Sequence, residues 1–129
     1  MVRALHPTTI EVTTEEHLTE RGDCIIGVAS DKACLGLSDE VKRALRVDGS
    51  RVSLEILVED ERLSVRCLGD SRLSLTNPRD IVVRRSDYVD GRTLAVGADL
   101  AAVDIPRRIV ERLKRADTTG ILEIVVALP

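Results

Sequence analysis

Two aspartates stand where a pair of carboxylates could do chemistry. Asp31 and Asp99 each follow a hydrophobic stretch of strand type and precede a stretch of helical type. Two carboxylates close together can bind a divalent cation or share one proton, so the pair predicts a ligand site or a metal site. The alternative is that each aspartate makes only the side-chain-to-backbone hydrogen bond of a turn.

Histidine and cysteine supply further candidate ligands, but without a metal-binding spacing. No CxxC, HxxxH or HExxH pattern occurs among the five residues of these types, which are His6, His17, Cys24, Cys34 and Cys67. Cys24 and Cys67 alternate in phase with apolar residues and are expected to be small buried side chains. Cys34 is the better candidate for an exposed thiol. His6 is a candidate base or ligand and completes a predicted metal set with the two aspartates.

Arginines gather in one strand-turn-strand stretch, at positions 79, 84, 85 and 92. Arg85 and Arg92 flank the expected turn and could hold a phosphate or a carboxylate, since a guanidinium binds such groups in bidentate fashion. The predicted ligand-binding residues are therefore Asp31, Asp99, Arg92 and Arg85. Solvated strand ends and surface ion pairs are the alternative explanation. The sequence has no glycine-rich phosphate loop and no Gly-x-Ser-x-Gly motif.

An internal repeat specifies the elements that must position these residues. Residues 25–58 align with residues 93–126 without a gap, and the alignment pairs Asp31 with Asp99. Most apolar positions pair with apolar positions, for example Leu54 with Leu122. A repeat of this length indicates one supersecondary unit that was duplicated and packed against its copy about a pseudo-twofold axis.

Each unit is predicted to contain a strand, a second strand, a helix and a last strand. Alternating apolar residues favour strands, and apolar residues at helical spacing favour helices. Strands are expected at 9–13, 24–29, 52–58, 63–68, 80–84, 93–98 and 121–128. Ser38 is the expected N-cap of the first helix, and Asp104 that of the second. The helical spacing predicts that four side chains are buried: Val41, Leu45, Ile109 and Leu113.

These elements predict one mainly-β domain over residues 1–129, with repeat one at about 7–68 and repeat two at about 77–129. Duplicated units of this order build double-psi and related cradle-loop barrels, so a small β-barrel is expected. A two-layer β-sandwich is the alternative arrangement of the same strands. A barrel is favoured because closure removes edge strands.

Composition restricts the classes of partner. The net charge is -3, Phe and Trp are absent, and Tyr88 is the only aromatic residue, so nucleic-acid binding is not expected. Glutamine is absent and Asn77 is the only asparagine, which favours a thermophilic source. No apolar run approaches the roughly 20 residues of a membrane span. Three cysteines without paired spacing favour reduced thiols and a cytoplasmic location.

Several stretches resemble an uncharacterised archaeal family, domain-of-unknown-function family 371. The most specific is Gly22-Asp23-Cys24-Ile25-Ile26-Gly27-Val28, supported by residues 77–86 and 91–94. Members of that family begin with a longer Gly-His-Pro segment, which is contracted here to residues 5–9, and Leu100 stands where they tend to have lysine. The resemblance implies an archaeal, mainly-β, cytosolic protein and no established activity.

Two functions are compatible with these residues. The first is a non-catalytic binding or adaptor module that recognises a protein or an anionic ligand through its loops. The second is a small metal-dependent hydrolase that uses Asp31, Asp99 and His6. Either site is expected between residues 29–37 and 97–105, with His6 or Arg92 at the rim. The sequence specifies no cofactor, no reaction and no oligomeric state.

Overall fold

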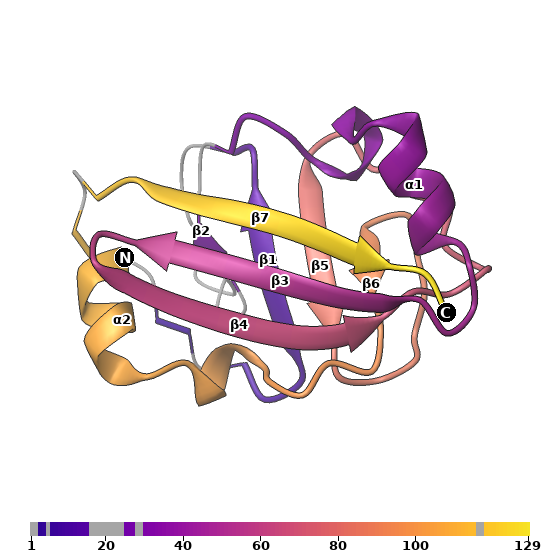
Figure 1. Cartoon of the computed structure of the whole chain (residues 1–129). Coiled ribbons are helices and arrows are strands. Elements are labelled where there is room, and N and C mark those ends of the chain that lie inside the picture. Colours follow the sequence, from indigo (N-terminus) through magenta and orange to yellow (C-terminus); the bar gives the residue numbers. More distant parts are fainter. Residues whose placement is uncertain (1–2, 5, 16–24, 28–29, 116–117) are drawn as a thin grey trace.

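The computed structural model describes residues 3–4, 6–15, 25–27, 30–115 and 118–129. The chain is mainly β with two short α-helices, as predicted (Figure 1). Its strands are β1 (Thr9–Thr13), β2 (Ile25–Gly27), β3 (Arg51–Val58), β4 (Glu61–Leu68), β5 (Asp80–Arg84), β6 (Thr93–Ala95) and β7 (Gly120–Ala127). Its helices are α1 (Asp39–Leu45) and α2 (Arg107–Leu113), each preceded by a short 3₁₀ turn, η1 (Cys34–Gly36) and η2 (Ala102–Asp104).

Four strands form sheet A in the order β2-β1-β5-β6. The central pair, β1 and β5, is antiparallel, and each central strand has a parallel outer neighbour. The register of β1 with β2 shifts after Glu11, and that of β5 with β6 shifts after Val82. Glu11 and Val82 lie opposite each other, so both irregularities occur at the centre of the sheet.

Three antiparallel strands form sheet B in the order β4-β3-β7. A two-residue turn joins β3 to β4, and its first residue, Glu59, has a positive φ of 56°, as in a type II′ hairpin turn. Period-two alternation of apolar and polar residues in β3 buries Val52, Leu54, Ile56 and Val58. The sequence predicted this inward phase correctly.

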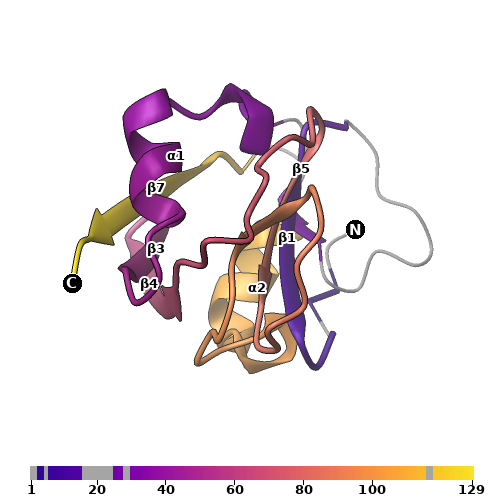
Figure 2. The ribbon, with the colours of Figure 1, turned by 90° about the vertical axis from the view of Figure 1, so that its right-hand side faces the viewer.

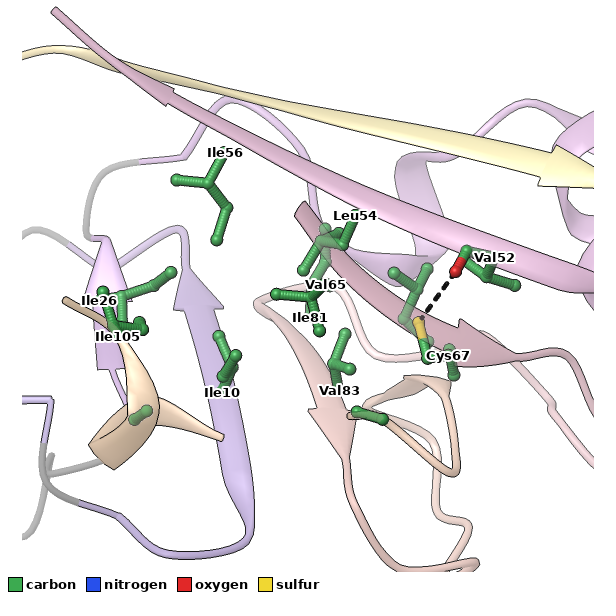
Figure 3. Close-up of a cluster of buried hydrophobic side chains, with 14 of the residues drawn as sticks. Ile10, Ile26, Val52, Leu54, Ile56, Val65, Cys67, Ile81, Val83 and Ile105 are labelled. Carbon is green, nitrogen blue, oxygen red and sulfur yellow. Dashed lines mark hydrogen bonds between the residues drawn. The ribbon is translucent and has the colours of Figure 1, made fainter. Parts of the chain in front are cut away.

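The two sheets face each other in the view of Figure 2, and the side chains of the core lie between them (Figure 3). Inward side chains of sheet B meet Ile10, Ile81 and Val83 of sheet A in one apolar cluster. The core is entirely aliphatic apart from buried thiols, because the sequence has no Phe or Trp. Close packing of branched aliphatic side chains is what holds the layers together.

The two helices begin differently. Ser38 caps α1, and its hydroxyl accepts a hydrogen bond from the Val41 backbone N–H (3.3 Å), as predicted. The predicted cap at Asp104 is wrong, because that residue ends η2 and α2 begins only after Pro106. Asp104 accepts a hydrogen bond from the Ala101 N–H instead (2.9 Å).

The four apolar side chains that were expected to be buried on the two helices differ in their burial. Leu45 and Ile109 are fully buried, as predicted. Val41 and Leu113 are only half-buried, so the prediction of full burial is wrong for these two. Each helix is only two turns long, so few of its positions reach the core: Leu45 in α1, and Ile109 together with Val110 in α2.

The predicted closed barrel is wrong for the part of the chain that the structure describes. The sheets are joined at one corner, where Leu68 and Val96 exchange two backbone hydrogen bonds (2.8 and 3.0 Å). At the other side, β7 pairs only with β3 and β2 pairs only with β1 among the described strands. Two facing sheets, the alternative arrangement, are what the strands form. No helix among the described residues is long and apolar enough to cross a membrane.

The repeat alignment matches the positions of the elements. It pairs residue 25 with 93, 34 with 102 and 39 with 107, which are the first residues of β2 and β6, of η1 and η2, and of α1 and α2. It also pairs Glu55 with Glu123, and these two residues lie opposite each other in the β3–β7 ladder. The pseudo-twofold relation between the halves stays a prediction.

Candidate functional site

The strand order separates the two predicted aspartates. Asp31 lies in the segment that follows β2, and Asp99 in the segment that follows β6. Because β2 and β6 are the two outer strands of sheet A, these segments leave the sheet from opposite edges. The architecture therefore does not bring the two carboxylates together through their strands.

Asp99 links sheet B to the segment after β6 through two hydrogen bonds. Its Oδ1 accepts a hydrogen bond from the Arg66 backbone N–H (2.9 Å), and its own N–H donates to the Arg66 carbonyl (2.9 Å). This is the side-chain-to-backbone bonding that the alternative interpretation of the aspartates describes. It also places Asp99 at the edge of a depression described below.

His6 is tied to its own segment and to η2. Its Nδ1 accepts a hydrogen bond from the Thr8 N–H (3.2 Å), and its carbonyl accepts one from the Val103 N–H (3.0 Å). No group of three His, Cys, Asp or Glu side chains that could hold a metal occurs among the residues that the structure describes. The candidate ligands His17 and Cys24 lie outside the described residues.

Arg92 is the centre of an ionic cluster on sheet A. Its Nη1 lies 3.1 Å from Glu11 Oε1 and 3.6 Å from Asp80 Oδ2, and its Nε lies 3.8 Å from Asp90 Oδ2. Arg84 contacts the same Asp90 carboxylate (3.1 Å). Three carboxylates therefore face two guanidinium groups, and the excess negative charge disfavours an anion at Arg92.

Burial and charge shift two of these carboxyl groups in opposite directions. The Glu11 side chain is only 8% exposed, and burial, followed by the neighbouring Asp80 carboxylate, raises its pKa above the usual range. Burial also acts to raise the pKa of Asp90. The Arg92 backbone N–H and the Arg84 guanidinium outweigh that effect, so the pKa of Asp90 is lowered. This cluster anchors the segment between β5 and β6.

Arg85 belongs to a separate contact. Its Nη1 lies 3.2 Å from Asp104 Oδ2, and both side chains are substantially exposed. Arg84 and Arg85 point to different partners, as the strand alternation predicts. The structure therefore does not bring Arg85 and Arg92 into one anion-binding pair through shared contacts.

The prediction of an exposed thiol at Cys34 is wrong. Cys34 is buried in η1, and its Sγ donates a hydrogen bond to the Arg92 carbonyl (3.2 Å). Cys67 is buried as predicted, and its Sγ contacts the Val52 carbonyl at 3.6 Å (Figure 3). Burial raises the pKa of both thiols to about 12, so neither is a nucleophile near neutral pH.

The outer face of sheet B is a surface on which several large apolar side chains are exposed. Figure 1 looks onto this face, and neither α1 nor α2 lies in front of it. Large apolar side chains are exposed on it: Ile121 is 60% exposed, Val125 52% and Leu68 45%. Exposed apolar side chains grouped on one face mark an interaction site more often than isolated ones do.

One end of this face is hollowed into a depression of about 620 Å³. Its lining combines apolar and charged residues of sheet B and of the segment after β6, including Arg51, Arg66, Leu68, Asp99, Val125 and Ala127. Arg51 and Arg66 are exposed and form no ion pair with any residue that the structure describes. The depression therefore has two guanidinium groups and one carboxylate, Asp99, beside apolar side chains, and this excess of positive charge favours a partner that is apolar and carries carboxylates.

The centre of the face carries the opposite charge. Glu55 accepts hydrogen bonds from Ser64 and Ser53 (2.9 Å from Ser53) and lies 3.5 Å from Arg62. The Ser64 and Ser53 bonds, in that order, lower the pKa of Glu55. Its cross-strand neighbour Glu123 has no ion pair within the described residues.

Sequence reasoning did not identify this face as a candidate site. The available signal was the outward phase of the strands, where Leu57, Ile121 and Val125 replace the polar residues expected on a solvated face. Only the sheet order shows that these residues share one surface. Asp99 is the one predicted site residue that lines the depression.

Comparison with known proteins identifies relatives of the chain. A family model described as "Domain of unknown function (DUF371)" matches residues 1–127. The chain is 42% identical over 113 residues to "Uncharacterized protein MJ0206" of Methanocaldococcus jannaschii. That alignment covers 88% of this chain and 83% of the relative.

Proposed function

The chain belongs to the family described as Domain of unknown function (DUF371), and we propose that this member is a non-catalytic binding module. Its ligand is a partner protein that docks on the outer face of sheet B. The observation that carries the proposal is the depression in which Arg51 and Arg66 stand beside the exposed apolar residues Leu68 and Val125.

Charge complementarity defines the partner. Arg51 and Arg66 lack carboxylate partners among the described residues, whereas Glu55 is already bound by Arg62 and two serines. An apolar surface that carries carboxylates satisfies these arginines and covers the apolar residues. No observation favours the alternative, a metal-dependent hydrolase that uses Asp31, Asp99 and His6. A cytoplasmic location stays a prediction.

We also propose that the domain is an internal duplication over residues 1–129, with repeats at about 7–68 and 77–129. Equal spacing of the paired helices and strands supports it. The antiparallel β3–β7 ladder supports the duplication independently. Glu55 lies opposite Glu123 in this ladder, and the repeat alignment pairs the same two residues, so a twofold axis that passes between them would exchange equivalent positions. A superposition of residues 25–58 on 93–126 in an experimental structure, giving a rotation near 180°, is the test.

Titration with octanoate tests the docking surface, because this probe carries one carboxylate on an apolar chain. In ¹H–¹⁵N correlation spectra, we expect the amides of Arg66, Leu68 and Val125 to shift. Replacement of Arg66 by Glu should raise the dissociation constant about fivefold, since an exposed ion pair contributes roughly 0.2–1 kcal/mol and the reversal adds repulsion. The uncharged octanamide should bind more weakly than octanoate.

Arg43→Glu provides the matched control, because Arg43 is exposed on α1 and the substitution changes the net charge equally. Arg43→Glu should leave octanoate binding unchanged. Equal weakening by the two substitutions would reduce the effect to overall charge and refute the site. Shifts that spread over both sheets, or none at all, would refute it as well.

A further inference from the structure

The open edge of β7 exposes apolar side chains that the same positions of β3 bury. Leu122, Ile124 and Val126 point inward and pack on the core, but they are only half-buried. Their counterparts in the repeat, Leu54, Ile56 and Val58, are buried. The difference has a direct cause, because β3 has strands on both sides and β7 has only β3 among the described strands. A strand beside β7 would bury these three residues.

Successive residues of β7 direct their backbone N–H and C=O groups alternately toward β3 and toward the open edge. The β3–β4 hairpin shows which residues point in which direction. Val58 and Glu61 flank the two-residue turn and therefore exchange both backbone hydrogen bonds of their pair. In β3, residues 52, 54, 56 and 58 then bond to β4, and the alternate residues bond to β7. By the β3–β7 register, Leu122, Ile124 and Val126 direct their N–H and C=O groups to the open edge.

Few of the devices that keep natural edge strands from pairing occur along this edge, although α1 lies close to β7 and Glu123 carries a charge. Edge strands are normally protected by lysine or another charge, by proline, by a bulge, by shortness, or by a helix or loop that covers the edge. Residues 120–127, GILEIVVA, form eight strand residues with no lysine and no proline, and their ladder with β3 is regular throughout. β-branched residues are frequent in this stretch, which favours the extended conformation. Such an edge is a template for another strand.

The β3–β4 hairpin shows which strand chemistry fits. β4 runs antiparallel to β3 and places Val65 and Cys67 in the core, while its Ser64 donates a hydrogen bond to Glu55 and its Arg62 pairs with that carboxylate. Glu123 is the counterpart of Glu55 and has no such partner among the described residues. A second copy of β7 in an antiparallel pair centred near Glu123 would place two glutamates close together, which is unfavourable.

We propose that the open edge of β7 binds an extended segment of a partner protein as an added antiparallel strand. The segment has apolar residues on the side that faces the core, and a basic residue on the other side next to Glu123. Main-chain hydrogen bonds to residues 122, 124 and 126 provide affinity, and the side-chain pattern provides specificity. This site uses the backbone edge of β7 and does not depend on the depression beside Arg51 and Arg66.

A peptide with the sequence of residues 61–68, with Cys67 replaced by Ser, is the probe. Amide hydrogen exchange of the full chain is measured with and without saturating peptide. We expect exchange at Leu122, Ile124 and Val126 to slow at least tenfold, because their amides gain partners. The amides of Ile121, Glu123 and Val125 already bond to β3 and should change little. This alternation distinguishes strand addition from docking on the outer face.

Charge reversal tests the role of Glu123. Glu123→Arg should weaken binding of the peptide roughly threefold to tenfold, and a peptide with both arginines replaced by Glu should recover that loss on the variant. Glu111→Arg is the matched control, since Glu111 is exposed on α2 and should not affect binding. Arg66→Glu, which reverses the sign of the depression's net charge, should also leave peptide binding intact.

Three results would overturn the proposal. One is a uniform change, or no change, of exchange along β7. Another is equal weakening by Glu111→Arg and Glu123→Arg. The third is a free protein that sediments as a dimer with residues 122, 124 and 126 already protected, because a second copy of the chain would then occupy the edge.

Discussion

Arg92 shows how a side chain acquires its role from residues that are distant in sequence. Its guanidinium lies between Glu11 of β1, Asp80 of β5 and Asp90, so three separate segments determine its charge environment. The same contacts enclose Glu11, whose pKa is raised by burial and then by Asp80. The ionic cluster around Arg92 therefore contains a carboxyl group, Glu11, whose protonation makes the free energy of unfolding depend on pH.

Glu11→Gln should remove a pH dependence of the free energy of unfolding. Because the folded-state pKa of Glu11 is raised, the folded protein retains its proton to a higher pH than the unfolded chain. Wild-type stability should therefore fall as pH rises from about 4.5 through the raised pKa, and the variant should lack this fall. Urea unfolding at a series of pH values measures it.

Glu55→Gln is the control, because the pKa of Glu55 is shifted in the direction opposite to that of Glu11. The pKa of Glu55 is lowered by its serine bonds, so its contribution is present above the ordinary pKa and is lost as the protein is acidified. The Gln variant should lose stability at neutral pH and become less sensitive to acid. Identical pH profiles for both variants would contradict the assignment of these shifts.

The two α-helices depend for their stability on packing against the sheets. The two α-helices have seven residues each, which is too short for independent stability. Their contribution depends on few fully buried residues, Leu45 in α1 and Ile109 with Val110 in α2. The neighbouring stripe positions Val41 and Leu113 remain half in solvent.

Leu45→Ala and Ile109→Ala should each reduce the free energy of unfolding by about 2–5 kcal/mol, because each leaves a cavity in the core. Val41→Ala and Leu113→Ala should cost clearly less, since these half-buried sites lose less apolar contact. Chemical denaturation followed by circular dichroism provides the measurement. Similar losses at all four positions would contradict the observed division of burial.

At the scale of the whole molecule, ion pairs join α2 to the turn of sheet B. Arg112 lies 2.7 Å from Glu59, 2.6 Å from Asp60 and 3.7 Å from Glu61, and Arg115 adds a contact to Glu59 (3.2 Å). Networks of this kind contribute more than isolated surface pairs, particularly at high temperature. The thermophilic source that the composition predicts stays a prediction.

Arg112→Ala should lower the thermal midpoint at low ionic strength, because it removes the contacts of the guanidinium with Glu59, Asp60 and Glu61. In 1 M NaCl, where the screening length is about 3 Å, the difference from wild type should shrink. Arg43→Ala is the control, since Arg43 is exposed on the other helix. A midpoint difference that salt does not change would indicate lost packing of the arginine stem instead of lost charge.

The sequence by itself determined the local structure. Alternation in residues 51–58 specified β3 and its buried face, and Ser38 specified where α1 begins. Both depend on neighbours along the chain, so the signal is local. The family resemblance was also readable from the sequence, because the segments that carry it are contiguous.

Only the tertiary structure decided which residues meet. Asp31 and Asp99 are equivalent in sequence, yet their segments leave opposite edges of sheet A because the strand order is β2-β1-β5-β6. Cys34 was expected in an exposed loop, but η1 packs it beneath the Arg92 carbonyl. The open edge of β7 likewise follows from pairing between distant segments, and no local pattern encodes which strand remains without a neighbour.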